Sequence, residues 1–334
     1  MTTDDGRAVD ALFAAYTGSA VPGASVVVVQ NGQVVVRRAY GMADLERRIA
    51  ATPETGYRLA SVSKQFTAMA IMLLAKEGKL RYDQPIRDFL AELPPATRAI
   101  TVRHLLNHTS GIWDYEALIP ENRTTQLTDD DVLTLVASKD SLSTPPGVAY
   151  CYSNSGYVLL GMIVARVAGM PFPEFLRARI FVPVGMESSV AHVEGADTVP
   201  RRAYGYSPRS GSFVQTDQSV TSATLGDGGI YSNVDDLVRW DRALAGATLI
   251  DRAALAEATT PPVLPGGPSE YGFGWFVDRY RGETRWRHTG ETSGFRNAIL
   301  RFPEQKLTIV ILTNRSSGEP QAIAERIADR FLFR

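Results

Sequence analysis

A serine and a lysine lie three residues apart in the stretch 59–66, at the start of an apolar run. If a helix begins near Ser61, positions i and i+3 lie on one face, so the Lys64 ammonium lies about one turn from the Ser61 hydroxyl. This Ser-x-x-Lys spacing is one in which a serine acts as the nucleophile of acyl transfer. A chain of this length contains about one such pair by chance, so the interpretation depends on partner groups elsewhere.

An acyl-transfer site on serine needs a further proton carrier, an oxyanion hole and a wall that orients the substrate. Tyr152 follows a Pro-Pro-Gly turn and precedes an apolar helical pattern, where the positive end of a helix favours a phenolate. Asn154 offers both a donor and an acceptor beside it. The triplet His288-Thr289-Gly290 stands at the end of a predicted strand, where glycine lets a substrate backbone approach closely. These residues supply candidates for the proton carrier and the wall.

The two ends of the chain predict one antiparallel sheet. A Val-rich strand over 24–30, an Asn-Gly turn and a strand over 33–40 form a hairpin. A helix over 4–17 precedes this hairpin, and a helix over 319–331 follows the last strand. Strand patterns near the C-terminus cover 271–280, 284–288, 295–302 and 307–313. The expected fold class is α/β of the α+β type: an antiparallel sheet flanked by terminal helices, with a mainly helical lobe inserted.

The middle of the chain changes to helical patterns separated by loops rich in Pro and Gly. These patterns cover 61–78, 85–93, 102–107, 129–138, 153–168, 173–182 and 234–243. We therefore predict a sheet lobe made of 1–60 and 250–334 and a mainly helical lobe made of 61–249. Ser61 then falls at the seam between the lobes, where ligand clefts usually lie.

Three motifs, in chain order, resemble the signature of penicillin-recognising serine hydrolases: Ser61-Val62-Ser63-Lys64, Tyr152-Ser153-Asn154 and His288-Thr289-Gly290. The most similar branch contains class C β-lactamases, serine D-Ala-D-Ala carboxypeptidases and related esterases. Flanking segments look like that branch too, at 22–24, 104–111, 228–232 and 301–303. The resemblance covers nearly the whole chain and implies the β-lactamase/transpeptidase-like fold.

The resemblance also implies a role for each motif residue. Ser61 would be acylated, and Lys64 and Tyr152 would share the proton taken from it. Asn154 would hydrogen-bond both Lys64 and the amide side chain of the substrate. The backbone N–H groups of Ser61 and Glu291 would form the oxyanion hole, in which the loss of one donor costs roughly 3 to 4 kcal/mol of transition-state stabilisation.

The third motif departs from this pattern. His288, Thr289 and Gly290 are expected to contact the substrate, but His288 stands where class C β-lactamases have lysine, which disfavours efficient β-lactam hydrolysis and predicts a local charge that depends on pH. Glu291 stands where carboxylate-binding relatives tend to carry a hydroxyl, so its charge disfavours a substrate with a free carboxylate. Three arginines would compensate if they point into the cleft: Arg285, Arg287 and Arg296.

One triplet has a second copy. Tyr231-Ser232-Asn233 repeats the residue types of 152–154, but Asp235 and Asp236 and a helical pattern follow it. We therefore interpret Ser232 or Asn233 as a helix N-cap with acidic support in the first turn. The catalytic tyrosine is assigned to the first copy.

His104 and His108 have the i, i+4 spacing of zinc ligands. Leu105, however, stands where a metalloprotease would carry its catalytic glutamate, and no third ligand suggests itself. No phosphate-binding loop or dinucleotide fingerprint occurs either. The sequence therefore predicts structural roles for both histidines and neither a metal ion nor a cofactor.

Composition limits which binding partners and which cellular compartment are expected for the protein. The chain of 334 residues has a formal charge of −1, which leaves no overall footprint for nucleic acid or an anionic membrane. Cys151 is its single cysteine, which excludes an internal disulfide. The acidic N-terminus is not followed by an apolar signal region, and the longest apolar run, 66–75, is too short to span a bilayer. We expect a cytoplasmic protein without a membrane span, or a periplasmic or secreted one whose signal has been removed; its oligomeric state stays open.

Three functions fit these observations. The first is a serine hydrolase that cleaves an amide, a D-Ala-D-Ala-type peptide or a β-lactam, through an acyl-enzyme on Ser61. The second is a short-chain carboxylesterase of the same fold, and the third is a non-catalytic penicillin-binding sensor. The loops 112–125 and 261–270 show no pattern that selects a small-molecule or peptide substrate.

Overall fold

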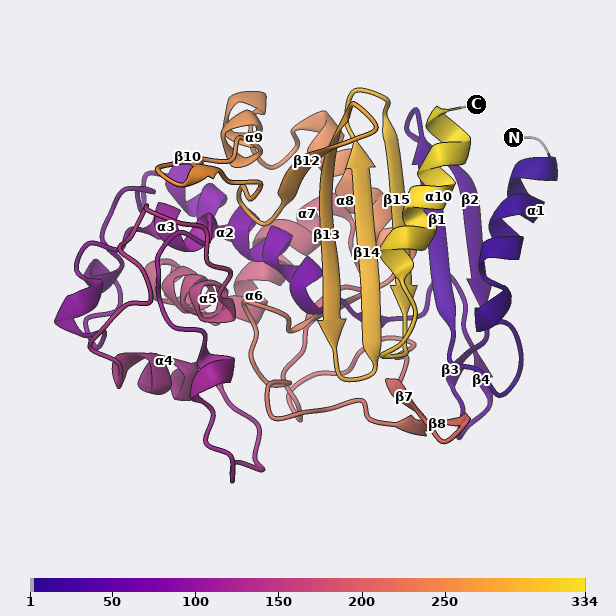
Figure 1. Ribbon diagram of the computed structural model, residues 1–334, viewed down its shortest axis with the longest axis horizontal. Coiled ribbons are helices and arrows are strands. Elements are labelled where there is room, and N and C mark those ends of the chain that lie inside the picture. Colours follow the sequence, from indigo (N-terminus) through magenta and orange to yellow (C-terminus); the bar gives the residue numbers. More distant parts are fainter. Residues whose placement is uncertain (1–2, 334) are drawn as a thin grey trace.

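The main sheet joins the two ends of the chain (Figure 1). The computed structural model describes residues 3–333, and within them this sheet has six strands in the order β12-β13-β14-β15-β1-β2, all neighbours antiparallel. The strands are β1 (Ala24–Gln30), β2 (Gln33–Tyr40), β12 (Phe276–Tyr280), β13 (Glu283–Thr292), β14 (Phe295–Phe302) and β15 (Leu307–Thr313). Because β1 pairs with β15, the N-terminal hairpin extends the C-terminal strands into one sheet.

The strands β1, β14 and β15 are buried on both faces of the sheet, to which successive side chains of a strand point in turn. Val26 and Val28 of β1 lie in the core under the terminal helices, whereas Val27 and Val29 lie in the core shared with the helical part. The flanking helices are α1 (Thr3–Leu12) and α10 (Pro320–Leu332) on one face and α8 (Val234–Gly246) on the other. Burial on both faces explains why β1 is a continuous apolar run rather than an alternating one.

The helical part lies beside the sheet in Figure 1 and is centred on two packed helices, α2 and α5. Its helices are α2 (Lys64–Lys76), α3 (Val102–Leu106), α4 (Asp129–Ala137), α5 (Asn154–Ala168), α6 (Phe172–Leu176), α7 (Val182–Val184) and α9 (Arg252–Ala258). Residues 64–74 of α2 are all buried. An apolar helix that is buried all round places its first turn inside the protein, which puts Lys64 in the interior.

The remaining strands of the described residues are short and form four small sheets. They are β3 (Met42–Asp44), β4 (Ile49–Ala50), β5 (Tyr57–Arg58), β6 (Val190–Ala191), β7 (Tyr206–Arg209), β8 (Ser212–Gln215), β9 (Ile230–Ser232), β10 (Val263–Leu264) and β11 (Gly267–Pro268). β5 pairs with β9, and the Leu59 N–H then donates to the Ile230 carbonyl at 2.8 Å. This pairing holds the chain in place immediately before Ser61.

The expected fold class is confirmed, with the antiparallel sheet and its terminal helices in place. The strands predicted over 24–30, 33–40, 295–302 and 307–313 match β1, β2, β14 and β15. The helix predicted over 61–78 begins instead with a 3-10 turn, Ala60–Ser63, and becomes α-helical at Lys64.

Other predicted boundaries were wrong. The strand predicted over 284–288 continues to Thr292 because β14 pairs with it along that length, so His288-Thr289-Gly290 lies inside β13 rather than at its end. Only 276–280 of the strand predicted over 271–280 forms β12. The helix predicted over 85–93 is a 3-10 turn at Ile86–Asp88, and two prolines at 94–95 stop any extension. Helix α9 has no counterpart among the predicted elements.

The division of the chain into lobes at residues 60 and 250 stays a prediction. Helix α8, which was assigned to the helical lobe, contacts β1 and β15 of the sheet. Among residues 3–333, no single helix has both the length and the apolar character to cross a membrane; α5 taken with the bent segment 172–184 passes that test by length and composition only.

Candidate active site

Ser61 lies on a tight turn held by the sheet. The preceding residue, Ala60, has a φ of 49°, a left-handed conformation that costs a non-glycine residue on the order of 1–3 kcal/mol. The Asn297 side chain of β14 donates to the Leu59 carbonyl at 3.2 Å and to the carbonyl of the residue before it at 2.8 Å. Gly290 of β13 lies so close that a Cβ there would stand 2.0 Å from the Leu59 carbonyl oxygen. The sheet therefore holds Ser61 at the start of α2, and only glycine fits at position 290.

Lys64 is fully buried and directs all three hydrogens of its ammonium group to acceptors. Its Nζ donates to Ser61 Oγ at 2.9 Å, to Asn154 Oδ1 at 2.8 Å and to the Asp227 carbonyl oxygen at 2.9 Å. A buried charge is tolerated when its hydrogen-bonding capacity is satisfied in this way. The i, i+3 contact predicted between Ser61 and Lys64 is present, and the structure brings Asn154 to the same point.

Tyr152 completes the group around the serine. Its hydroxyl lies 3.0 Å from Ser61 Oγ, and the Lys64 ammonium lies 5.0 Å from the centre of its ring. The buried His108 ring lies 4.1 Å from the Tyr152 ring, and His108 Nδ1 accepts from the Ser153 N–H at 3.2 Å. His108 therefore fixes the position of the segment that carries the tyrosine.

His288 is buried next to this group but is occupied by other partners. Its Nδ1 lies 2.6 Å from the Thr289 carbonyl oxygen and therefore carries the hydrogen, while Nε2 accepts from the Tyr271 hydroxyl at 2.9 Å. Burial, reinforced by the charge of Lys64, lowers the pKa of His288 to about 3. The expected pH-dependent charge at this position was wrong, because the ring is neutral at ordinary pH. Contact of His288 and Thr289 with a substrate stays a prediction.

Glu291 faces the same cavity as Ser61 but directs its charge outward. Its side chain is 60% exposed and forms an ion pair with Arg296 at 3.3 Å. Arg285 and Arg287 bind Asp278 instead and do not line this cavity. Of the three arginines, only Arg296 therefore offsets the charge of Glu291. The oxyanion hole formed by the N–H groups of Ser61 and Glu291 stays a prediction.

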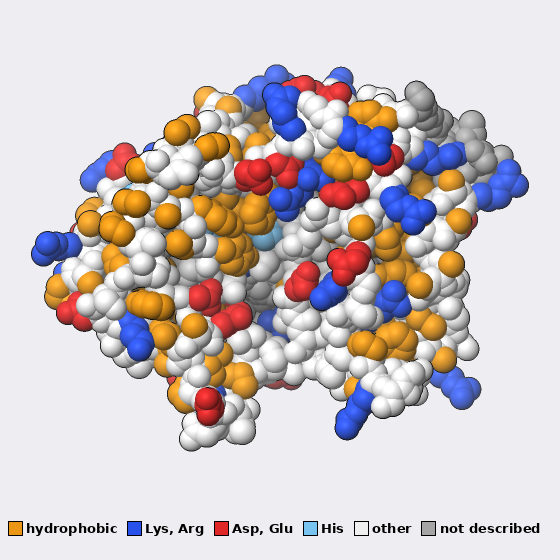
Figure 2. Space-filling model, viewed as in Figure 1, with side chains coloured by type: hydrophobic (Ala, Val, Ile, Leu, Met, Phe, Trp, Pro, Cys, Tyr) orange, Lys and Arg blue, Asp and Glu red, His pale blue; other side chains and the backbone are white. Residues whose placement is uncertain are grey.

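The cavity at Ser61 has a volume of about 200 Å³ and an acidic end. Asp227 is buried; its Oδ2 accepts from the Tyr115 hydroxyl at 3.0 Å, and its Oδ1 has no hydrogen-bond partner within residues 3–333. Glu116 accepts from Asn154 Nδ2 at 3.0 Å. Figure 2 shows a hollow between the helical part and the sheet, with acidic side chains on both sides of it.

A third carboxylate supports this acidic end. Asp114 Oδ2 accepts from the Asn154 N–H at 2.6 Å, and Asp114 Oδ1 accepts from the Glu116 N–H at 2.9 Å. Loss of surrounding water raises the pKa of Asp114 and of Glu116, and for both the charge of Asp227 adds to the effect. Carboxyl groups that raise one another's pKa in this way are stabilised by a cation placed between them.

Sequence reasoning missed this acidic end. The loop 112–125 showed no recognisable pattern, yet it supplies Asp114, Tyr115 and Glu116. The one available signal was the placement of two acidic residues around a tyrosine, directly after the flanking segment 104–111 that resembled the family. Asp227 gave no signal, because its backbone carbonyl makes the contact to Lys64.

The remaining motif candidates have structural surroundings. His104 forms the capping box of α3 with Thr101, and its Nδ1 accepts from the Thr101 N–H. Asn233 caps α8 by accepting from the Asp236 N–H at 2.8 Å, as the interpretation of the second triplet expected. Within the described part of the chain, no group of three or more His, Cys, Asp or Glu side chains is arranged to hold a metal ion.

Comparison with known proteins places this chain in a family. A family model described as Beta-lactamase matches residues 9–332. Penicillin-binding protein 4* of Bacillus subtilis (strain 168) is 28% identical over an alignment that covers 92% of this chain and 75% of the relative. A D-aminopeptidase of Gluconobacter oxydans (strain 621H) is 30% identical, with 96% of this chain and 60% of the relative aligned.

Solved structures agree with this placement. The D-amino acid amidase of Ochrobactrum anthropi SV3, complexed with D-phenylalanine, has a TM-score of 0.84 at 25% identity and covers 99% of this chain and 98% of its own. The octameric penicillin-binding protein homologue of Pyrococcus abyssi has a TM-score of 0.83 at 29% identity, with 98% and 76% covered. The chain belongs to the beta-lactamase family.

At the level of this family, the chain is similar to hydrolases that act on amides. It spans 60% of the length of the Gluconobacter D-aminopeptidase and 75% of the length of the Bacillus penicillin-binding protein. The comparisons therefore establish the family, and the reaction and substrate of this chain are inferred from the site itself.

Proposed function

We propose that the protein is a serine amidase that forms an acyl-enzyme on Ser61. The observation that carries this proposal is the convergence of Lys64 Nζ and the Tyr152 hydroxyl on Ser61 Oγ, at 2.9 Å and 3.0 Å. Both distances lie within the hydrogen-bonding reach that a proton acceptor needs. A serine with two such neighbours is activated as a nucleophile without a histidine.

The reaction follows from this geometry. Ser61 Oγ attacks the carbonyl carbon of the substrate, and the Lys64–Tyr152 pair, in the form that holds one proton fewer than an ammonium and a phenol together, takes the serine proton. The same pair returns the proton to the nitrogen of the leaving group as the carbon–nitrogen bond breaks. Water then attacks the ester on Ser61 and gives up a proton to the pair, which releases the acid and restores the serine. The N–H groups of Ser61 and Glu291 are proposed to hold the oxyanion.

We infer that the substrate carries an ammonium group near the scissile amide. The support is the acidic end of the cavity, where Asp227 Oδ1 has no hydrogen-bond partner among the described residues and Glu116 lies beside it. An ammonium group placed there would offset the repulsion between the carboxylates. The names of two relatives, a D-aminopeptidase and a D-amino acid amidase, fit a substrate with a free amino group.

A pair of substrates tests this inference. D-Phenylalanine p-nitroanilide carries the ammonium group, and 3-phenylpropionyl p-nitroanilide lacks it. In Glu116→Gln, which keeps an acceptor for Asn154 Nδ2, kcat/KM for the first substrate should fall roughly tenfold or more, since hydrogen bonds to charged groups are worth that much. The second substrate should change less than about threefold.

Glu121→Gln is the matched control, because Glu121 is exposed in the same loop and does not line the cavity. This variant should leave both substrates unaffected. An equal loss for both anilides in Glu116→Gln, or no loss for either, would contradict an ammonium site at the acidic end.

The second candidate is an esterase that uses the same nucleophile. The observation in its favour is the neutral His288, since no cation stands at the position where class C β-lactamases carry lysine. Arg58 lines the cavity, but its guanidinium donates to the carbonyls of Ser222 and Gly228. A higher kcat/KM for p-nitrophenyl butyrate than for D-phenylalanine p-nitroanilide, lost in Ser61→Ala, would favour the esterase.

A further inference from the structure

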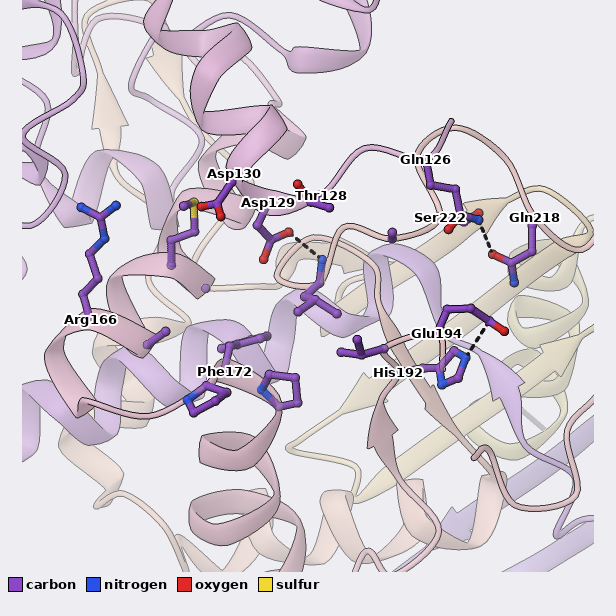
Figure 3. A pocket seen from close by; sticks show the side chains of 18 residues that line it. Gln126, Thr128, Asp129, Asp130, Arg166, Phe172, His192, Glu194, Gln218 and Ser222 are labelled. Atoms are coloured by element: carbon purple, nitrogen blue, oxygen red, sulfur yellow. Dashed lines mark hydrogen bonds and ion pairs between the residues drawn. The ribbon is translucent and has the colours of Figure 1, made fainter. Parts of the chain in front are cut away.

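A second cavity, drawn in Figure 3, shares the loop 218–228 with the cavity at Ser61. Its volume is about 620 Å³, against about 200 Å³ at Ser61. It lies between the first turn of α4, the middle of α5, the turn 171–173, residues 192–194 and the loop 218–225. Within residues 3–333, no residue lines both cavities. Its volume falls in the range of about 300–1,000 Å³ that small-molecule sites usually have.

The loop 218–228 contributes to both cavities: residues 218, 222, 223 and 225 line the second cavity, and residues 219, 221, 224, 227 and 228 line the cavity at Ser61. Leu225 lines the second cavity, and its N–H donates to Asp129 Oδ1 at 3.0 Å. Asp227 lines the first cavity, and its carbonyl accepts from Lys64. Between them, Gly226 is packed so tightly that a Cβ there would stand 2.2 Å from the Tyr157 carbonyl oxygen. A ligand against Leu225 therefore contacts a residue that lies two positions along the chain from Asp227, whose carbonyl accepts from the Lys64 ammonium.

The second cavity is mostly apolar and contains one carboxylate with a free oxygen. Its apolar lining comes from Met162, Ala165, Pro171, Phe172, Pro173, Val193, Ala223 and Leu225. Asp129 is half-buried among them; Leu225 occupies its Oδ1, and its Oδ2 has no hydrogen-bond partner within residues 3–333. Burial, reinforced by the charges of Asp227 and Asp130, raises the pKa of Asp129 to about 7. Figure 3 shows Asp129 above Phe172, on the opposite side of the same space.

The other charges around this cavity leave it acidic. The Arg166 guanidinium, its one permanently cationic group among the described residues, is bound to both carboxylate oxygens of Glu92, at 2.7 and 3.0 Å. His192 contacts the carboxylate of Glu194 at 3.2 Å. Asp130, at the start of α4, is exposed and adds a further negative charge. A ligand in this cavity therefore meets an apolar surface and a negative potential.

We propose that this cavity is a second ligand site, for a small apolar amine whose ammonium group binds Asp129 Oδ2. The hydrocarbon part of the amine lies against Met162, Phe172 and Leu225. An ammonium ion offers the donor that Asp129 Oδ2 lacks, and an apolar body removes the lining from water. Arg166 does not repel the cation, because Glu92 neutralises it.

The location of a bound amine tests the proposal directly. The probe is 4-bromophenethylamine, because anomalous diffraction from its bromine places it in crystals without assuming a site. We expect bromine in the cavity beside Asp129. Bromine only in the Ser61 cavity, or none bound at all, would overturn the proposal. This result is independent of the proposed amidase activity, which the anilide kinetics test separately.

Calorimetric titration tests the chemical class. Phenethylamine should bind Asp129→Asn about tenfold or more weakly than wild type, because that variant keeps an acceptor for the Leu225 N–H but loses the charge. Asp130→Asn removes the same charge one residue away and should change the affinity less than about threefold. Equal losses in the two variants, or equal binding of the uncharged 2-phenylethanol to wild type, would overturn the amine assignment.

A cavity-filling variant covers the case in which Asp129→Asn fails to fold. Ala165→Trp places an indole in the space and should abolish the Asp129-dependent binding while the melting temperature stays within a few degrees of wild type. Unchanged phenethylamine affinity in a folded Ala165→Trp protein would overturn the proposal.

Discussion

The triplet Tyr-Ser-Asn occurs twice in this chain, and its two copies lie in different surroundings. In the first, the Tyr152 hydroxyl lies 3.0 Å from Ser61 Oγ and Asn154 Oδ1 accepts from Lys64. In the second, the Tyr231 hydroxyl is buried without a hydrogen-bond partner among residues 3–333, and Asn233 caps α8. Identical residue types thus contact Ser61 and Lys64 in one place and form a helix cap in the other.

The difference lies in the elements that precede each copy. Tyr231 belongs to β9, which pairs with β5, so its main chain is extended and its ring is held between Arg202 and Phe295. Tyr152 follows a loop, and the His108 ring positions it over Lys64. The comparison teaches that a short motif gains a function only from the neighbouring elements that orient it.

Removal of each tyrosine hydroxyl should give the largest difference in activity between the two copies. Tyr152→Phe should lower kcat/KM for D-phenylalanine p-nitroanilide by about 10²–10⁴, the usual worth of a positioned proton carrier. Tyr231→Phe should change it less than about threefold and should not lower the melting temperature, because it removes a buried hydroxyl that has no partner. Equal losses, or a loss only in Tyr231→Phe, would show that the wrong copy was chosen.

The two asparagines should separate activity from stability. Asn154→Ala removes an acceptor from the buried Lys64 ammonium and should lower kcat/KM by roughly 10- to 100-fold. Asn233→Ala removes the cap of α8 and should lower the free energy of unfolding by about 0.5–2 kcal/mol with little change in kcat/KM. Urea denaturation and steady-state kinetics on both variants check this; a catalytic defect in Asn233→Ala would remove the distinction.

Protonation of the histidines around the first copy gives an effect on stability that is graded with pH. The pKa of His288 is about 3 in the folded protein and about 6.5 in an unfolded chain, and burial lowers the pKa of His108 in the same direction. Below pH 6.5 the unfolded state binds more protons than the folded state, so stability falls as the pH falls from 6.5 toward 3. Each group contributes about 1.4 kcal/mol per pH unit.

Urea denaturation as a function of pH measures this slope. The variant His288→Gln should have a shallower dependence than wild type between pH 6.5 and 4, because one of the two depressed groups is absent. An identical slope in this variant would mean that the His288 ring is not kept neutral by the fold.

The sequence predicted the outer strands and helices well, since each depends on local pattern. The Asn31-Gly32 turn and the valines before it gave the first hairpin with the bounds observed. The end of β13 was missed because its length is set by pairing with β14, which a single segment does not reveal.

The candidate site residues were chosen from their order along the chain, and the structure brings Ser61, Lys64 and Tyr152 within hydrogen-bonding distance, which order alone does not contain. The Asn297 side chain donates to the main-chain carbonyl of Leu59, and the main-chain carbonyl of Asp227 accepts from the Lys64 ammonium. Because each contact uses a main-chain carbonyl, the type of the residue that carries the carbonyl gives little signal. Burial decides the neutrality of His288, and burial depends on the whole fold. Sequence alone therefore named the candidates, whose catalytic roles stay a prediction, and the three-dimensional contacts gave their partners.

The central claim is that Ser61 is acylated, and mass spectrometry of the protein after reaction with ampicillin tests it most directly. Ampicillin combines a reactive amide with an ammonium group, and a neutral residue at position 288 disfavours efficient turnover of β-lactams. We predict an added mass of one ampicillin on the peptide that contains Ser61. The adduct should be absent in Ser61→Ala and present in Ser63→Ala, whose buried hydroxyl accepts from the Ile230 N–H. An adduct on another residue, or undiminished anilide hydrolysis by Ser61→Ala, would contradict the claim.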